Sequence, residues 1–406
     1  MAEDPPGTID RLRTDAVRES PASPYDAWRE VSTTQPEAVQ LGVGFPFTDA
    51  FPAEELAAAT DEVLREEPEA LQYGGSETAD SLPGAVADHV GRRGLRIEPD
   101  EVIVTGGASR TIDAIADVFL EPGRLVFTEE ATFPSAVTYF RDHGAAVAGC
   151  ALDRDGLDVA ALAEELARRE RTGKVLPTLL YTIPTFQNPT GTTLPRERRE
   201  ALLDLATEYD FAILEDDAYG ALRYDGEDVP PLAAMDRERP GPDRVIHVGT
   251  AAKTIAPGVR IGWVIAPEAV SEEIERRHAG AANSFARSAV ARYLAEEPLE
   301  ESVADLRESY RSRRDHMLSR LAREMPSHTD WTEPDGGFFV WVTLLEGTDS
   351  EAMLPQAAAE GVIYMPGSAF YPNEGGENRL RLSFSTGTPA EIEGAVAALA
   401  RTIRSA

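Results

Sequence analysis

The hydrophobic residues between about 100 and 270 fall into short runs that turn-forming residues interrupt. The runs read "EVIVTGG", "RLVFTEE", "TLLYTIP", "FAILEDD", "RVIHVGT" and "RIGWVIAP". The stretches between them have the apolar spacing of helices. Strands that alternate with helices form a mostly parallel sheet that helices cover on both faces. We therefore predict an α/β fold, with a three-layer α/β/α domain in this region.

The pattern changes after about residue 290. A long charged helix, "AEEPLEESVADLRESYRSRRDHMLSRLAREM", precedes the strands "GGFFVWVTL", "GVIYMPG" and "LRLSFS" and a last helix, "PAEIEGAVAALARTIRSA". This order predicts a smaller α+β domain, and a chain of 406 residues is long enough for two domains. We expect an N-terminal arm and part of the small domain over 1–50, the large domain over 51–290 and the small C-terminal domain over 291–406.

Composition narrows the classes of function. With 71 acidic and 39 basic residues the net charge is −32, which would repel a nucleic-acid backbone. The chain has no run of about 18 apolar residues that could span a membrane. The single cysteine, Cys150, excludes an internal disulfide, and the six histidines lack metal-ligand spacing. We expect no nucleic-acid, membrane or metal partner.

The N-terminus and the acid excess bear on location. "MAEDPPGTIDRLRTD" lacks the apolar segment of a secretory signal, so we expect a cytoplasmic protein. An acidic surface with almost no lysine is consistent with a salt-rich, halophilic cytoplasm, where charges are screened within a few ångströms. We take this as a hypothesis about the environment.

Lysine is almost absent from the chain. Of the 39 basic residues only Lys174 and Lys253 are lysines. Lys174 lies in the charged turn "RERTGKVLP" and is expected on the surface. Lys253 follows a predicted strand in "GTAAKTIAPGVRIGW". Because arginine stays protonated and is no nucleophile, a lysine retained at this place indicates chemistry that needs an amine.

Other reactive groups follow neighbouring predicted strands. Asp216 and Tyr219 stand in "FAILEDDAYG", Asn188 stands in "PTFQNPTG", and the strand-to-helix turn "TGGASR" could bind a phosphate. Ligands of such sheets gather at the carboxyl ends of the strands. An amine, a carboxylate for the ring nitrogen, a phenol and an amide for the ring oxygen and a phosphate site are what pyridoxal phosphate requires. We predict this cofactor.

The combined motifs resemble a known family. "NPTG", "EDDAYG", "GTAAKTIAPGVRIGW" and "RLRLSFS" have the order and spacing of the class I/II aminotransferases, which are pyridoxal phosphate enzymes of fold type I. The resemblance covers roughly residues 40 to 400. Within the family the chain is most similar to the branch that contains 2-aminoadipate and kynurenine aminotransferases and the aminotransferase-like half of the MocR regulators.

The resemblance implies roles for individual residues. Lys253 would bind the cofactor and move the proton of the substrate α-carbon. Asp216 would pair with the ring nitrogen, and Tyr219 and Asn188 would contact the ring hydroxyl. The phosphate would be held by Ala108, Ser109, Thr250, Arg260 and Tyr73 of the neighbouring subunit. Phe133 would stack on the ring. The substrate would be bound by Arg381, Asn188 and Gly44.

Departures from the family pattern bear on the substrate. Ala131 and Phe133 stand where the family often has Pro and Tyr, so a hydroxyl contact to the cofactor is lost. Members that favour acidic side chains tend to have an arginine in a segment like "SPYDAW", where this chain has Asp26. Asp26 would repel a second carboxylate, and Phe45 hints at apolar or aromatic substrates. We therefore do not expect a strong preference for 2-aminoadipate.

The resemblance implies an aminotransferase with a ping-pong mechanism, with glutamate and 2-oxoglutarate as the common pair, in a homodimer whose subunits share active sites. Two alternatives stay open. The same cofactor and scaffold could serve a β-lyase or a racemase. A MocR-like ligand-sensing module is the more remote alternative, because the arm of about 40 residues is too short and too acidic for a DNA-binding domain.

Overall fold

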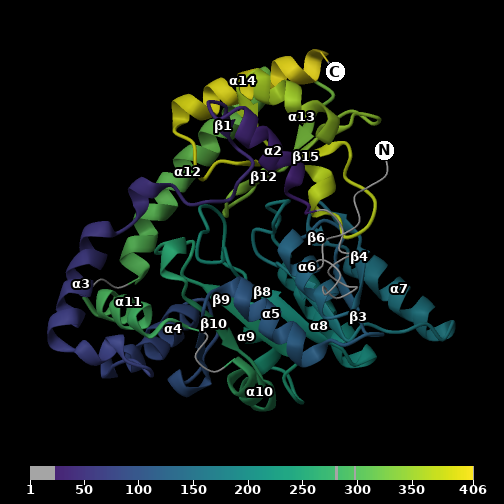
Figure 1. Ribbon diagram of the computed structural model, residues 1–406. Coiled ribbons are helices and arrows are strands. Elements are labelled where there is room, and N and C mark those ends of the chain that lie inside the picture. Colours follow the sequence, from purple (N-terminus) through teal and green to yellow (C-terminus); the bar gives the residue numbers. More distant parts are fainter. Residues whose placement is uncertain (1–22, 279–281, 297–298, 406) are drawn as a thin grey trace, which may run out of the picture.

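The computed structural model describes residues 23–278, 282–296 and 299–405. Residues 1–22 of the predicted arm lie outside this range. The helices are α2 (Asp26–Thr34), α3 (Ala53–Glu66), α4 (Leu82–Gly91), α5 (Ala108–Phe119), α6 (Pro134–Asp142), α7 (Val159–Arg171), α8 (Arg196–Tyr209), α9 (Leu232–Arg237), α10 (Glu268–His278), α11 (Ser284–Glu296), α12 (Leu299–Glu324), α13 (Ser350–Ala359) and α14 (Pro389–Ser405) (Figure 1).

The strands are short. They are β1 (Val39–Gln40), β2 (Ile103–Thr105), β3 (Leu125–Glu129), β4 (Ala146–Cys150), β5 (Leu152–Asp153), β6 (Gly156–Leu157), β7 (Leu179–Thr182), β8 (Ala212–Asp216), β9 (Val245–Thr250), β10 (Gly262–Ile265), β11 (Asp330–Trp331), β12 (Phe339–Thr343), β13 (Val362–Ile363), β14 (Met365–Pro366) and β15 (Arg379–Ser383).

A seven-stranded sheet forms the centre of the larger part of the molecule. Its strand order is β2-β10-β9-β8-β7-β3-β4. All neighbouring pairs are parallel except those of β10, which runs antiparallel to both β2 and β9. The predicted mostly parallel sheet is confirmed.

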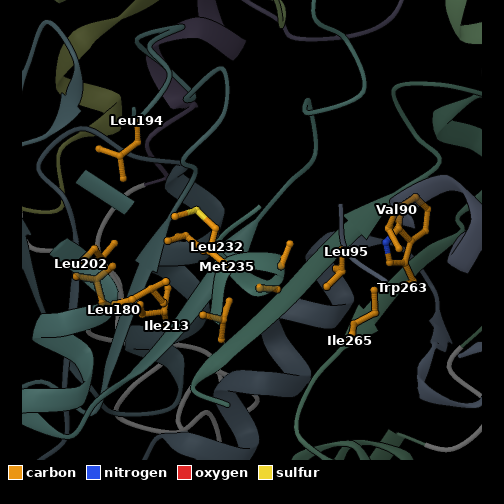
Figure 2. Close-up of a cluster of buried hydrophobic side chains, with 14 of the residues drawn as sticks. Val90, Leu95, Leu180, Leu194, Leu202, Ile213, Leu232, Met235, Trp263 and Ile265 are labelled. Atoms are coloured by element: carbon orange, nitrogen blue, oxygen red, sulfur yellow. The ribbon is translucent and has the colours of Figure 1, made fainter. Parts of the chain in front are cut away.

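Alternate residues of the central strands face opposite helical layers. Leu180 and Ile213 pack into one buried cluster with residues of α4, α8, α9 and α11, and Figure 2 shows this cluster with Trp263 and Met235. Tyr181 and Leu214, the next residues along the two strands, pack into a second cluster with α5 and α6. Strands buried on both faces need apolar residues at every position, which explains the continuous apolar runs.

A smaller α+β part lies at the top of Figure 1, around α12, α13 and α14. Its four-stranded sheet has the order β11-β12-β15-β14, with antiparallel pairs. α14 and α13 pack on it through a core that includes Val340, Leu382 and Leu399. The segment that contains α2 and β1 also belongs to this part. Val31 of α2 packs in the same core, and β1 pairs with β13.

The topology brings several strand ends to one edge of the large sheet. β8 ends at Asp216 and β9 ends at Thr250, in parallel register. β10 is antiparallel to both β9 and β2. Its first residue, Gly262, therefore lies beside Thr250, the last residue of β9, and beside Thr105, the last residue of β2. The segments that follow these strand ends and precede β10 therefore meet at the same edge.

Candidate active site

Lys253 lies in the turn that follows β9. Its Nζ donates a hydrogen bond to the Gly44 carbonyl oxygen at 2.9 Å and lies 5.7 Å from the ring centroid of Tyr219 and 5.6 Å from that of Phe338. Burial lowers the pKa of Lys253 to about 8, and Arg381 acts in the same direction. The neutral, nucleophilic amine is therefore accessible near neutral pH.

Asp216 ends β8 within the same buried region. Its Oδ2 accepts a hydrogen bond of 2.7 Å from the Tyr181 hydroxyl. Among the described residues its other oxygen, Oδ1, is buried without a partner. Burial raises the pKa of Asp216 to about 6, and the negative charge of Asp217 adds to the rise. A protonated ring nitrogen would satisfy the unpartnered oxygen and hold the carboxylate in its charged form.

A turn without side chains precedes α5. Gly107 has a φ of 101°, and a Cβ on it would lie 2.9 Å from Nη2 of Arg260. A Cβ on Gly262 would lie 2.8 Å from Gly107 itself. The first backbone N–H groups of α5, at Ala108 and Ser109, therefore have a guanidinium close by, an arrangement that suits a phosphate group.

Thr250 borders this turn from the end of β9. Its hydroxyl accepts a hydrogen bond of 3.1 Å from the backbone N–H of Ala252 and donates one of 3.2 Å to the Ile261 carbonyl. These bonds fix the hydroxyl between the Lys253 turn and the start of β10, beside the segment that carries Arg260.

Arg381 is a buried cation in β15 of the small sheet. Its Nη1 donates to Asn188 Oδ1 at 2.6 Å, and its Nη2 donates to the Gly42 carbonyl. The guanidinium carbon lies 4.1 Å from the ring centroid of Phe339 and 4.7 Å from that of Phe370. Burial lowers the pKa of Arg381 to about 10, so the group stays charged at neutral pH. A buried cation of this kind is suited to a carboxylate ligand.

The other candidate residues differ in their placement. Tyr219 is buried, with its ring against Phe338 and Phe339. A Cβ on Gly44 would lie 2.5 Å from Cζ of Phe339, so only glycine fits there without a shift. Phe133 is half-buried directly before α6. Tyr73 is 98% exposed, and one chain does not bring it to the other candidate residues.

Sequence reasoning missed two groups of the site. Tyr181 donates to Asp216, and the Gly42 carbonyl accepts from Arg381. A tyrosine inside the apolar run "TLLYTIP" was a detectable signal, because a buried phenol needs a hydrogen-bond partner. A backbone carbonyl gives no signal in the residue pattern.

The residues at this edge of the sheet fit pyridoxal phosphate. The unpartnered Asp216 oxygen can accept from a ring N–H, and the glycine turn with Arg260 and Thr250 can hold a phosphate. Lys253 lies between Thr250 and Arg260 in the chain and supplies the amine that would bind the aldehyde.

Comparison with known proteins agrees with this assignment. Residues 36–399 match the family "Aminotransferase class I and II", so the chain belongs to that family. It is 37% identical to aromatic-amino-acid aminotransferase 1 of Thermococcus litoralis, over 91% of this chain and 88% of that protein. It is 34% identical to 2-aminoadipate transaminase of Thermus thermophilus, over 92% of this chain and 91% of that protein.

A solved aminotransferase structure has the same fold as this chain. Kynurenine aminotransferase of Pyrococcus horikoshii, solved in complex with PMP, superposes with a TM-score of 0.91 at 35% identity, and the match covers 98% of each chain. The fold is that of the fold type I pyridoxal phosphate enzymes. The protein is an aminotransferase, and pyridoxal phosphate is its cofactor.

The described part of the chain contains neither a metal-binding cluster nor a membrane-spanning helix. Within 23–278, 282–296 and 299–405, no three His, Cys, Asp or Glu residues are grouped so as to hold a metal ion. In the same ranges every helix is too short or too polar to cross a membrane.

Proposed function

We propose that this aminotransferase takes the amino group from L-amino acids with aromatic or apolar side chains and passes it to a 2-oxo acid, in two successive half-reactions. The proposed side-chain preference rests on the exposure of Phe45. Its ring is 61% exposed, while the preceding residue, Gly44, accepts the hydrogen bond of Lys253. An exposed aromatic residue that follows the contact of the reacting amine along the chain can offer an apolar surface to the substrate side chain.

The environment of Asp26 supports the same preference. Its carboxylate is 56% exposed and pairs with Arg29 at 3.3 Å, on the helix that also contributes to the core of the small domain. Residue 26 itself therefore carries a negative charge, which would repel a second substrate carboxylate, and the nearby cation Arg29 is already paired with it. The aromatic preference is also the one named in the Thermococcus litoralis relative.

We assign the following work to the residues of the site. When bound, pyridoxal phosphate supplies the aldehyde that takes up the amino group and a ring that accepts electrons. Lys253, as a neutral amine, would accept the proton of the substrate α-carbon and deliver it to the former aldehyde carbon of the cofactor. Asp216 holds the ring nitrogen protonated. The positive charge of Arg381 binds and orients the substrate α-carboxylate.

The remaining residues position these groups. Asn188 links Arg381 to the segment after β7. Its amide, together with Tyr219, would also hold the ring hydroxyl of the cofactor. Ala108, Ser109, Thr250 and Arg260 hold the phosphate, while Phe133 covers the ring. Gly44 would lie beside the substrate, by resemblance to the family, and its lack of a side chain lets the backbone pack closely against Phe339. These roles rest on the geometry of the site and on the family resemblance.

Several wider assignments belong to the proposal. Glutamate and 2-oxoglutarate serve as the common pair, by resemblance to the family. The chain forms a homodimer in the cytoplasm, and Tyr73 completes the site of the neighbouring subunit. The domains divide near residues 50 and 290, and the acidic surface is adapted to high salt.

An absorbance experiment tests the proposal. The holoenzyme is mixed with single amino acids, without an acceptor, and the visible band of the bound cofactor is followed. Aromatic and apolar amino acids should abolish the band, and 2-oxoglutarate added afterwards should restore it. If only 2-aminoadipate or aspartate abolishes the band, the side-chain preference is wrong. Release of ammonia without loss of the band would mean a lyase.

A further inference from the structure

A basic cavity lies outside the active site, although the whole chain is strongly acidic. It has a volume of about 270 Å³. Its charged and titratable lining residues are His89, Arg92, Arg93, Arg223, Arg307 and Asp228. Four guanidinium groups and one carboxylate line the cavity, in a chain of net charge −32, and a second carboxylate, Asp217, pairs with Arg93 from outside the lining.

Two of these arginines are nearly buried and have N–H donors without a hydrogen-bond partner among the described residues. The side chains of Arg93 and Arg223 are 7% and 10% exposed. Arg93 pairs with Asp217, and Arg223 pairs with Asp228 at 2.9 Å. Among the described residues Nε and Nη2 of Arg93 and Nη2 of Arg223 have no partner. Buried donors of a charged group without a partner are costly, which favours an acceptor in this cavity.

The arginines of the cavity help to lower the pKa of His89. The pKa of His89 is lowered to about 3, first by burial and then by Arg93, Arg307 and Arg92. His89 is therefore neutral at physiological pH, and its ring packs edge-on against Trp263. The arginine charges around it remain, and Arg92 is exposed and has no ion-pair partner among the described residues.

The cavity also lies where the two parts of the molecule meet. Arg93 follows α4 of the large part, and Arg307 belongs to α12, which packs on α14. The loop that carries Arg223 continues into Tyr224, whose hydroxyl donates to the Gly337 carbonyl of the small part at 2.5 Å. Arg307 donates to the Ala221 carbonyl of the same loop at 2.7 Å.

We propose that this cavity binds a small oxyanion, of the phosphate or polycarboxylate type, between α4, the loop after β8 and α12. Guanidinium forks match the oxygens of such anions in pairs. The bound anion would accept hydrogen bonds from the unpartnered donors and tie the large part to the loop that leads to the small part. The site is separate from the cofactor phosphate, which the glycine turn before α5 holds.

The test titrates the holoenzyme with inorganic phosphate by calorimetry, at constant ionic strength set by sodium chloride and near pH 7.5. The holoenzyme is used because its cofactor phosphate site is already filled. Wild type should bind phosphate and unfold at a higher temperature as phosphate rises. Citrate in place of phosphate distinguishes the two anion types, since the one with the lower dissociation constant is the better fit.

Three variants locate the binding. Arg92→Gln is exposed and should raise the dissociation constant about tenfold, the effect of one lost charge-assisted hydrogen bond. Asp228→Asn removes the carboxylate that occupies Arg223 and should lower the constant several-fold. Arg401→Gln, an exposed arginine of α14 paired with Glu360, should leave it unchanged. Absence of binding beyond that of chloride, or equal constants in all four proteins, would overturn the proposal.

Discussion

The two lysines offer a matched pair at the residue scale. Lys253 is in the site with its pKa lowered to about 8, whereas Lys174 is exposed after α7. We expect Lys253→Ala to lose the visible band of covalently bound cofactor and to lower kcat by about a thousandfold or more, since both binding and proton transfer need the amine. Lys174→Ala should change neither. Absorbance spectra and steady-state rates check this, and a normal band in Lys253→Ala would contradict the assignment.

The buried carboxylate of Asp216 predicts a pH dependence in the cofactor-free protein. Burial raises its pKa to about 6, above that of the unfolded chain, so ionisation opposes folding. The cost is absent below about pH 4 and complete above about pH 6. The Asp216→Asn variant does not have this free-energy cost, because asparagine does not ionise. The free energy of unfolding of the variant, relative to wild type, should therefore rise by about 1.5 kcal/mol between about pH 5 and about pH 8.

Denaturant titrations of both proteins at several pH values measure this difference. In the holoenzyme the same substitution should instead lower kcat, because the ring nitrogen loses its anionic partner. A difference in stability that does not change with pH would show that Asp216 is not destabilised by its burial.

At the scale of the element, the turn between β2 and α5 depends on glycine for two reasons. Gly107 has a φ of 101°, and a Cβ there would approach Arg260. Gly123, between α5 and β3, has a similar φ of 96° but open space around it. Gly107→Ala should weaken cofactor binding about tenfold or more because the cradle is filled, whereas Gly123→Ala should show only backbone strain of about 1–3 kcal/mol.

Equilibrium dialysis of the cofactor against both variants separates the two effects, and thermal unfolding reports the strain they share. Equal cofactor affinity in the two variants would mean that the turn does not hold the phosphate.

Much of the fold could be predicted because strands buried on both faces leave apolar runs that are easy to recognise. The runs that became β3, β7, β8 and β9 are of this kind. The antiparallel direction of β10 could not be predicted, since apolar runs carry no direction. The two-residue strands such as β5 and β6 are too short for any periodicity. Tyr181 was passed over for a related reason, because its contact to Asp216 depends on strand register.

At the scale of the whole molecule, the exposed Tyr73 predicts an assembly. Tyr73 is 98% exposed in the single chain, so its side chain is free to reach a neighbouring subunit, as the resemblance to the family implies. Light scattering should give a mass near twice the 44.0 kDa of one chain. Tyr73→Phe should raise the dissociation constant of the cofactor several-fold, because the proposed hydroxyl contact to the phosphate of the neighbouring subunit would be lost. Tyr209→Phe serves as the control. A monomer with full activity would contradict the shared site.

The net charge of −32 predicts a dependence on salt. The 71 acidic residues repel one another in dilute buffer, and screening weakens this repulsion within a few ångströms at about 1 M salt. The thermal midpoint should therefore rise with sodium chloride, and potassium chloride should have a similar effect. A midpoint that is constant from dilute buffer to molar salt would count against adaptation to high salt.

The distribution of amines gives the chain a practical property. Within the described residues Lys174 is the one lysine at the surface, on the turn after α7, and it lies outside the proposed site. Amine-directed reagents should therefore modify the holoenzyme at Lys174, together with the chain terminus, and leave the active site intact. A fluorophore or a point of immobilisation could be attached at Lys174 without engineering the sequence.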